Sequence, residues 1–445
     1  MANPSTAHSP PPSRLFAGWF TLVAMALFAI TACASNGGCA SSPDADEPTD
    51  EPTDIEEPTD APAKLETEVD DTVDTEACAR AINALAFDLW ATLEHGDNAA
   101  ISPASISTAL SMVLAGAGGQ TAQELADALH LSTDDDTHHC WAQLLESWQD
   151  FDAKDGMDFQ VANRLFADQQ ATLRDDYQRF TERFYGAGLQ AMDFRHQPDA
   201  SRQEINQWVE EVTRERIQDL LPPPAVTPQT DLVLVNAIYL LGEWAHAFNP
   251  DRTEEQPFHG ADGSSQEVPM MRQTEHVPYA DVDGAQIVEL PYAHEGLSMI
   301  FILPPEDQNL PDLMEDLDAA TLDGWLDELS TTEIGLTIPR FQIDAASVDL
   351  VDAFSALGVE RLFEGDADLS AIMEEQLFVN GIFHQTFVAV DEEGTEAAGA
   401  TGVAAIRGAA PTPEPTQFRA DRPFQFMIRD AHSGAILFLG HVGNP

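Results

Sequence analysis

The sequence predicts an α+β domain built around a large sheet, because helical and strand-like patterns fall in different halves of the chain. From about residue 76 to residue 216, apolar side chains recur at helical spacing. From about residue 231 onward, segments rich in β-branched or alternating apolar residues predominate. No linker-like break interrupts residues 76–445, so we expect one folded domain there.

In the helical half, Ala81, Leu85 and Leu89 share one face of a first helix, and Ser102-Pro103 marks the beginning of a second. The further segments with a helical pattern are 121–130, 136–148, 173–185 and 201–216. The segments with a strand pattern are 231–241, 285–290, 297–303, 333–339, 377–391 and 435–442. A helical region around 348–357 is expected to interrupt the strands.

The charge of the protein excludes some classes of partner. Its 445 residues include 77 acidic and 20 basic side chains, which gives a net charge of −57. Nucleic acids and anionic polysaccharides such as heparin need a basic face, so we expect neither as a ligand. The acidity is interpreted as a means of keeping an extracellular protein soluble.

The N-terminus predicts export. Arg14 precedes an apolar run over residues 15–32, whose length and flanking residues favour an export signal over a membrane span. The run ends in Ile30-Thr31-Ala32-Cys33, which resembles a bacterial lipobox, so residues 1–33 are predicted to be a signal peptide. A lipidated Cys33 would anchor the protein to the cell envelope, whereas a plain cleaved signal would leave it extracellular.

Residues 34–75 have the composition of a tether. The tetrapeptide Glu-Pro-Thr-Asp occurs at 47–50, 51–54 and 57–60. Proline opposes helix and sheet, and like charges repel, so we expect an acidic, extended and disordered spacer before the folded domain.

Two of the four cysteines, Cys78 and Cys140, lie in the predicted domain. An oxidising compartment permits a disulfide between them, but the sequence does not show whether they are close. His138, His139 and Cys140 could suggest a metal site, yet no second ligand pair has suitable spacing, so a surface helix is favoured and no metal is expected.

Motifs of hydrolytic enzymes are missing from the sequence. It contains no Gly-x-Ser-x-Gly elbow and no His-Glu-x-x-His zinc pair. The glycines at 116–119 follow no predicted strand, so they do not form a phosphate loop. We therefore expect neither enzymatic activity nor a cofactor, and we expect a monomer.

One segment stands out by its composition. Residues 391–410 follow a strong strand pattern, precede a proline-rich run and consist largely of Ala, Gly, Thr and Val in their middle. Read as a strand, Thr395, Ala397, Gly399 and Thr401 share one uncharged face, which could enter a sheet without steric conflict. Composition alone favours an ordinary surface loop of small residues.

The segment resembles, nearly residue for residue, the hinge of inhibitory serpins, a family of serine protease inhibitors. Its hinge residues are Glu392, Glu393, Gly394, Thr395, Glu396, Ala397, Ala398, Gly399 and Ala400. Other blocks resemble further family segments in the same order; these are 98–112, 116–125, 234–244, 268–271, 336–341 and 418–430. Arg422 departs from the family, where histidine is common. The resemblance covers residues 76–445.

The resemblance implies a fold of about nine helices around a large central mixed sheet, with two smaller sheets and an exposed reactive-centre loop over about 392–410. It also implies suicide-substrate inhibition, in which a protease cleaves the loop and the freed arm inserts into the central sheet. Loop insertion in this family is an established case of strand addition. An arm of about 12 residues at ~3.3 Å each spans roughly 40 Å, enough to carry the attached protease across the molecule.

Individual residues acquire roles through the same resemblance. Gly394 would permit the backbone swing that starts insertion, and Thr395 would be the first inward side chain. The family has a polar cluster beneath the sheet opening, called the shutter, and the residues that match it are Ser102, Ser105, Asn236 and His384. Trp244 matches the residue that packs where the loop first enters the sheet.

The register of the cleaved bond stays open. Counting 17 residues from Glu392 places Gly408 before the cleaved bond, whereas a loop one residue shorter places Arg407 there. We favour Arg407–Gly408, because glycine gives a protease pocket nothing to hold, with Gly408–Ala409 and an elastase-like target as the next choice. The bonds Ala405–Ile406 and Ile406–Arg407 rank behind these. An arginine before the bond suits a trypsin-like or subtilisin-like protease. The alternatives are a non-inhibitory binding module on the same fold and a substrate that is cleaved without trapping.

Overall fold

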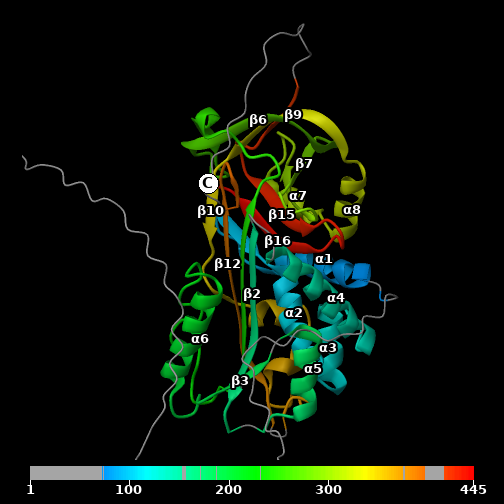
Figure 1. Ribbon diagram of the computed structural model, residues 1–445, viewed down its shortest axis with the longest axis vertical. Coiled ribbons are helices and arrows are strands. Elements are labelled where there is room, and N and C mark those ends of the chain that lie inside the picture. The colour runs from blue at the N-terminus through cyan, green and yellow to red at the C-terminus, as the bar shows by residue number, and fades with distance from the viewer. Residues whose placement is uncertain are drawn as a thin grey trace, which may run out of the picture. The chain divides into compact units, whose positions relative to one another are not determined.

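The computed structural model describes residues 73, 75–152, 157–170, 172–186, 188–230, 232–373, 376–395 and 415–445. Within these ranges, only the backbone is described at residues 135, 149–152, 157–163, 234, 236–239 and 395. Nine α-helices and two sheets lie in this part of the protein (Figure 1). The helices are α1 (Thr75–Thr92), α2 (Pro103–Leu114), α3 (Gly119–Ala128), α4 (Asp135–Asp152), α5 (Asp175–Tyr185), α6 (Pro198–Val212), α7 (Leu310–Glu315), α8 (Ala319–Asp327) and α9 (Val351–Ala356).

The central sheet is mixed and has a path of five strands. In spatial order they are β10 (Phe341–Asp344), β12 (Val379–Val390), β4 (Leu232–Glu243), β2 (Met157–Asp168) and β3 (Leu189–Met192). Strands β12 and β4 are parallel, whereas β4 and β2 are antiparallel. Two short strands lie off this path: β11 (Val348–Asp349) pairs with β12, and β13 (Gly394–Thr395) pairs with β4.

The second sheet has nine strands. Its path is β1 (Asn98–Ile101), β16 (Ile436–Val442), β15 (Phe424–Asp430), β8 (Leu297–Leu303), β7 (Ala285–Pro291), β6 (Ser265–Val282), β9 (Ser330–Pro339) and β14 (Thr416–Arg419), and β5 (Glu254–His259) pairs with β6. The 18-residue strand β6 pairs with β5, β7 and β9, so it joins what would otherwise be two smaller sheets into one hydrogen-bonded surface.

The two faces of the central sheet carry separate cores because successive side chains of a strand point to opposite faces. Val233, Val235 and Phe383 pack with Ile205 and Val209 of α6. The alternate positions face the larger core formed with the N-terminal helices. Figure 1 shows α6 on one side of β2 and β12, and α1 to α5 on the other. The α+β fold predicted from the sequence is confirmed.

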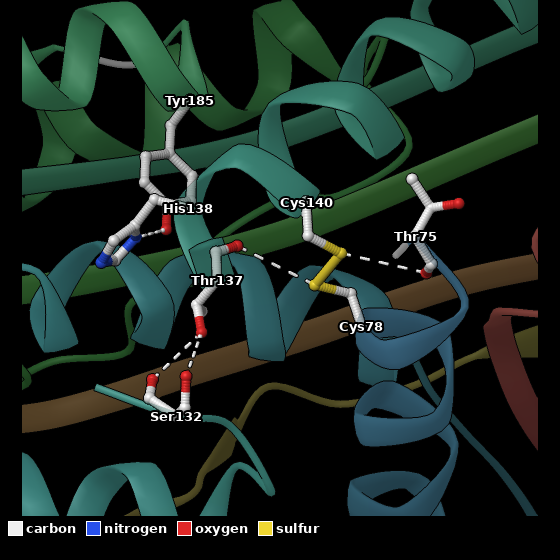
Figure 2. The surroundings of a disulfide bond; sticks show 7 residues. All are labelled: Thr75, Cys78, Ser132, Thr137, His138, Cys140 and Tyr185. Carbon is white, nitrogen blue, oxygen red and sulfur yellow. Dashed lines mark hydrogen bonds between the residues drawn. A yellow bond between two sulfur atoms is a disulfide. The ribbon is translucent and has the colours of Figure 1, made fainter. Parts of the chain in front are cut away.

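A disulfide joins α1 to α4. Cys78 and Cys140 are bonded and almost fully buried (Figure 2). Their sulfur atoms lie 3.9 Å from the backbone oxygens of Thr137 and Thr75, which are contacts rather than donated hydrogen bonds because a disulfide carries no proton. The pairing left open by the sequence is therefore made in the structure.

The neighbouring His138 takes part in the α4–α5 contact. Its Nδ1 lies 2.6 Å from the hydroxyl of Tyr185. Among the described residues, no group of His, Cys, Asp and Glu is arranged to hold a metal ion. Within the same residues, no helix combines the length and apolar character needed to cross a membrane.

Candidate functional site

The candidate site lies where β12 and β4 separate. The two strands pair in parallel register from Val379 opposite Leu232 to Phe387 opposite Tyr239. Beyond that point β4 continues to Glu243, and its last residues pair instead with β13. The segment that leaves β12 thus turns back and begins a new antiparallel strand at the end of β4.

A buried polar cluster lies beneath the paired part of these strands. Ser102 caps α2: its Oγ accepts a hydrogen bond from the Ser105 N–H at 3.3 Å and donates one to the Leu437 carbonyl at 2.6 Å. The Ser102 N–H donates to Nε2 of His384 at 3.0 Å. All three of these site residues are fully buried, so β12 is tied to the beginning of α2 by a hydrogen bond shielded from water.

The environment of His384 keeps its ring neutral. Burial lowers the pKa of His384 to about 3. Because Nε2 accepts the Ser102 N–H, the proton of the neutral ring sits on Nδ1. Among the described side chains, Nδ1 has no hydrogen-bond partner. Asn236 lies directly opposite His384 in the β12–β4 register, and its side chain is outside the description.

The turn after β12 is held by Trp244 and Phe248. The Trp244 backbone N–H donates to the Glu393 carbonyl at 2.8 Å, and its indole Nε1–H donates to the Asp391 carbonyl at 3.0 Å. The Phe248 N–H donates to the Glu392 carbonyl at 2.7 Å. Trp244 therefore lies against the residues that precede the hinge strand.

Glu392 is anchored by its side chain as well. Its two carboxylate oxygens accept hydrogen bonds from Nε and NH2 of Arg340, both at 2.6 Å, and Thr253 Oγ1 also donates to the carboxylate. Burial alone would raise the pKa of Glu392, but the hydrogen bonds from Arg340 and Thr253 outweigh it and lower the pKa. The hydrogen bonds from Arg340 to Glu392 likewise raise the pKa of Arg340.

The first residues of the hinge strand pack tightly on β4. Gly394 pairs with Glu243 and Thr395 pairs with Gly242. A Cβ atom at Gly394 would lie 1.9 Å from the carbonyl oxygen of Gly242, which no real side chain tolerates. Glycine at 394 therefore allows the two backbones to approach closely enough to pair.

Several predicted residues lie outside the described part of the protein. These are Cys33, Glu396, Ala397, Ala398, Gly399, Ala400, Arg407, Gly408 and Ala409. Their roles, including the register of the cleaved bond, stay predictions. Two groups of predicted site residues are brought together within the description. Ser102, Ser105 and His384 meet beneath the paired part of β12 and β4. Where these strands separate, Trp244 meets Glu393, and Gly394 pairs with the end of β4.

Arg340 and Thr253 are site residues that the sequence pattern did not reveal. In the sequence, Arg340 belongs to a strand block, and it is one of just 20 basic residues in a protein with 77 acidic ones. With so many carboxylates, the sequence does not indicate which of them pairs with Arg340. Nothing in the local pattern around Thr253 indicates its contact with Glu392.

Comparisons with known proteins agree with this geometry. The family model described as Serpin (serine protease inhibitor) matches residues 80–445. Antithrombin-III of Mus musculus is 38% identical over 360 residues, which cover 78% of this chain and 77% of the relative. Serpin B3 of Homo sapiens is 35% identical over 382 residues, which cover 81% and 97%.

The fold is also shared with solved structures. Human thyroxine-binding globulin, complexed with thyroxine, has a TM-score of 0.74 and 27% sequence identity, and the match covers 83% of this chain and 99% of that one. The family match spans both ends of the β12–β4 junction, and the matches to the two relatives cover 78% and 81% of the chain. The chain belongs to the serpin family.

Proposed function

We propose that the protein is a suicide-substrate inhibitor of serine-type endopeptidases. The target's serine Oγ attacks the carbonyl of the cleaved bond, the C–N bond breaks, and the segment that follows the bond leaves with a new amino group. The loop remains attached to the protease by an ester bond. The freed arm then inserts between β4 and β12 before water hydrolyses that ester.

The observation that carries the proposal is the pairing of β13 with the end of β4. The hinge already begins as an antiparallel strand at the place where β12 and β4 stop pairing. Continued insertion would replace one parallel ladder by two antiparallel ladders, each residue gaining backbone partners on both sides. The uncharged face at Thr395, Ala397 and Gly399 can be buried without desolvating a charge.

The alternative is a binding module on the same fold. It is favoured by the likeness to thyroxine-binding globulin, whose structure was solved with thyroxine bound. The small residues of the hinge favour inhibition instead, because they allow the arm to enter a sheet without steric conflict. A cleaved substrate without trapping is the third outcome of the experiment below.

Incubation with trypsin, subtilisin and elastase tests the proposal. An inhibitor forms an SDS-stable covalent complex with at least one of them, and cleavage raises the melting temperature as the arm inserts. A substrate is cleaved without complex, and a binding module gains no stability on cleavage. Mass spectrometry of the complex and the released peptide identifies the cleaved bond; we propose Arg407–Gly408 and hence a trypsin-like or subtilisin-like target.

Thr395→Arg provides the matched test of insertion. A guanidinium at the first inward position must be desolvated, so the variant should be cleaved at the normal rate but form little complex. Thr416→Arg places the same side chain at the exposed beginning of β14, beyond the loop, and should leave the complex yield unchanged. Equal complex yields from the two variants would count against insertion.

We also propose that the protein is exported and anchored to the cell envelope through an acyl group on Cys33. The support is the sequence Ile30-Thr31-Ala32-Cys33 after an apolar run. Metabolic labelling with an alkynyl fatty acid should label the protein, and Cys33→Ser should abolish the label. A Cys33→Ser protein that stays labelled excludes this anchor.

A further inference from the structure

A large cavity lies away from the hinge, between the C-terminal end of α1, helix α7 with the beginning of α8, and the end of β16. Its volume is about 610 Å³, within the range of small-molecule sites. Its apolar wall includes Phe87, Trp90, Leu310 and Met314. The proposed inhibition uses none of these residues, so the cavity needs an explanation of its own.

The charged groups around the cavity all have the same sign. Five carboxylates line it, from Asp88, Asp97, Asp262, Glu315 and Asp318, and no lysine or arginine is among the described residues that do so. Asp88 is engaged by His130 at 2.6 Å. Asp97 and Glu315 are exposed, and no ion pair holds either carboxylate among the described residues, although the charge of Asp97 also acts on the neighbouring His441. Both charges face solvent, so a ligand can reach them.

Two imidazoles add hydrogen-bond acceptors rather than charge. Nε2 of His95 lies 2.7 Å from the Trp90 carbonyl, and Nε2 of His441 lies 2.9 Å from the Gly96 carbonyl. A carbonyl only accepts, so Nε2 is the protonated nitrogen in both rings. Burial lowers the pKa of His95 and of His441, which keeps the rings neutral and leaves Nδ1 with a lone pair.

The same rings give the cavity an aromatic wall. His95 stacks on Trp90 with centroids 3.9 Å apart and planes 19° apart, and the edge of His441 meets both rings. Flat π surfaces favour a planar or cationic group laid against them. The wall is therefore aromatic and apolar, and its titratable polar groups accept hydrogen bonds or attract positive charge.

We infer that this cavity is a binding site for a small organic cation with an aromatic body, such as an arylalkylamine. The aromatic part would pack against Trp90 and Met314, and the ammonium group would lie toward Asp97 and Glu315. A segment of the protein itself is a poor occupant, because residues 34–72 carry many carboxylates that the five in the cavity would repel.

Calorimetric titration of the full-length protein with tryptamine tests the assignment. Tryptamine should bind saturably at one site, and added salt should weaken binding by screening the exposed carboxylates. Indole-3-propionate has a similar ring and side chain but a negative charge, and it should give no measurable binding. Equal binding of the two compounds, or no heat with tryptamine, overturns the proposal.

Variants place the bound cation in this cavity. Asp97→Asn and Glu315→Gln keep the shape of exposed side chains and should each weaken tryptamine binding about threefold, as expected for losing an exposed charge contact. Asp327→Asn is the matched control, since it removes the same charge from an exposed position of α8 outside the cavity, and it should change nothing.

Ala91→Trp tests occupancy without changing charge. Ala91 is exposed and lines the cavity, so an indole there fills the space from the surface. Tryptamine binding should be lost while the melting temperature is kept. Unchanged binding in Ala91→Trp, or an equal loss in Asp327→Asn, refutes the site. No readout depends on protease inhibition, so the outcome is separate from that of the proposed function.

Discussion

Arg340 holds Glu392 by two hydrogen bonds of 2.6 Å, and this pair connects the junction between β9 and β10 to the turn that leads into the hinge strand β13. The Glu392 side chain is only 4% exposed, whereas that of Arg340 is 45% exposed. The geometry is bidentate, which is the strongest arrangement of this kind of pair. The turn between β12 and β13 is therefore fixed by a side chain from the junction between β9 and β10.

Arg340→Ala should destabilise the protein and loosen this turn. Removing the guanidinium leaves a buried carboxylate with only Thr253 as a side-chain donor, and breaking a buried pair costs several kcal/mol. Because water screens the exposed Arg340, we expect a smaller loss of about 2 kcal/mol in the free energy of unfolding. Urea denaturation followed by circular dichroism measures it.

The control for this variant is Arg272→Ala. Arg272 pairs with Glu254 at 3.3 Å, and both side chains are more than half exposed. Such pairs contribute less than about 1 kcal/mol. An Arg272→Ala protein as unstable as Arg340→Ala would show that loss of any arginine from this acidic protein has the same effect.

The sequence was sufficient for a part of the site that depends on local pattern. Ser102 before Pro103 predicts the beginning of α2, which the structure confirms. The small residues after Glu392 predict a strand that can enter a sheet; most of them lie outside the described residues, so this stays a prediction. These signals arise from short-range chemistry, namely capping, proline geometry and side-chain size.

Contacts between distant segments were not readable in the same way. Arg340 and Glu392 are 52 residues apart, and only the packing of β10 beside β12 brings them together. The length of β6 and its role in joining two sheets also depend on pairing with β5, β7 and β9 rather than on its own pattern. Long-range pairing decides such features, and one sequence does not display it.

Stability should fall as the pH is lowered, because of His384. In the unfolded chain its pKa is near 6.5, and in the folded protein it is about 3, so the unfolded state binds the proton first as the pH drops. As the pH falls from 6.5 to 4.5, the contribution of His384 lowers the free energy of unfolding by up to about 1.4 kcal/mol per pH unit.

His384→Gln should remove this part of the pH dependence. The test compares urea midpoints of the two proteins at pH 7.5, 6.0 and 5.0. His139→Gln serves as the control, because it removes a histidine from α4 and should keep the slope of the unmodified protein. Parallel pH profiles for His384→Gln and the unmodified protein would contradict a neutral, buried His384.

The Cys78–Cys140 disulfide should contribute substantially to stability. It closes a loop of 62 residues between α1 and α4, and the chain-entropy model gives about 4 kcal/mol for a loop of this length. The double variant Cys78→Ala, Cys140→Ala should lower the urea midpoint accordingly. Dithiothreitol should do the same to the unmodified protein and leave the double variant unaffected; equal sensitivity of both proteins would contradict the assignment.

Gly394→Ala should detach the hinge strand from β4. A methyl group at this position would meet the Gly242 carbonyl oxygen at 1.9 Å and the Glu243 Cα at 2.6 Å, so the backbones must separate and the β13 pairing must be lost. The neighbouring bond from the Trp244 N–H to the Glu393 carbonyl should weaken with it. Hydrogen exchange of peptides covering residues 240–248 should therefore become faster in the variant.

Gly324→Ala is the matched control, because its Cβ meets nothing within 4 Å in α8. Unchanged exchange at 240–248 in Gly394→Ala would mean that the hinge does not depend on this close approach, and that insertion starts further along the loop.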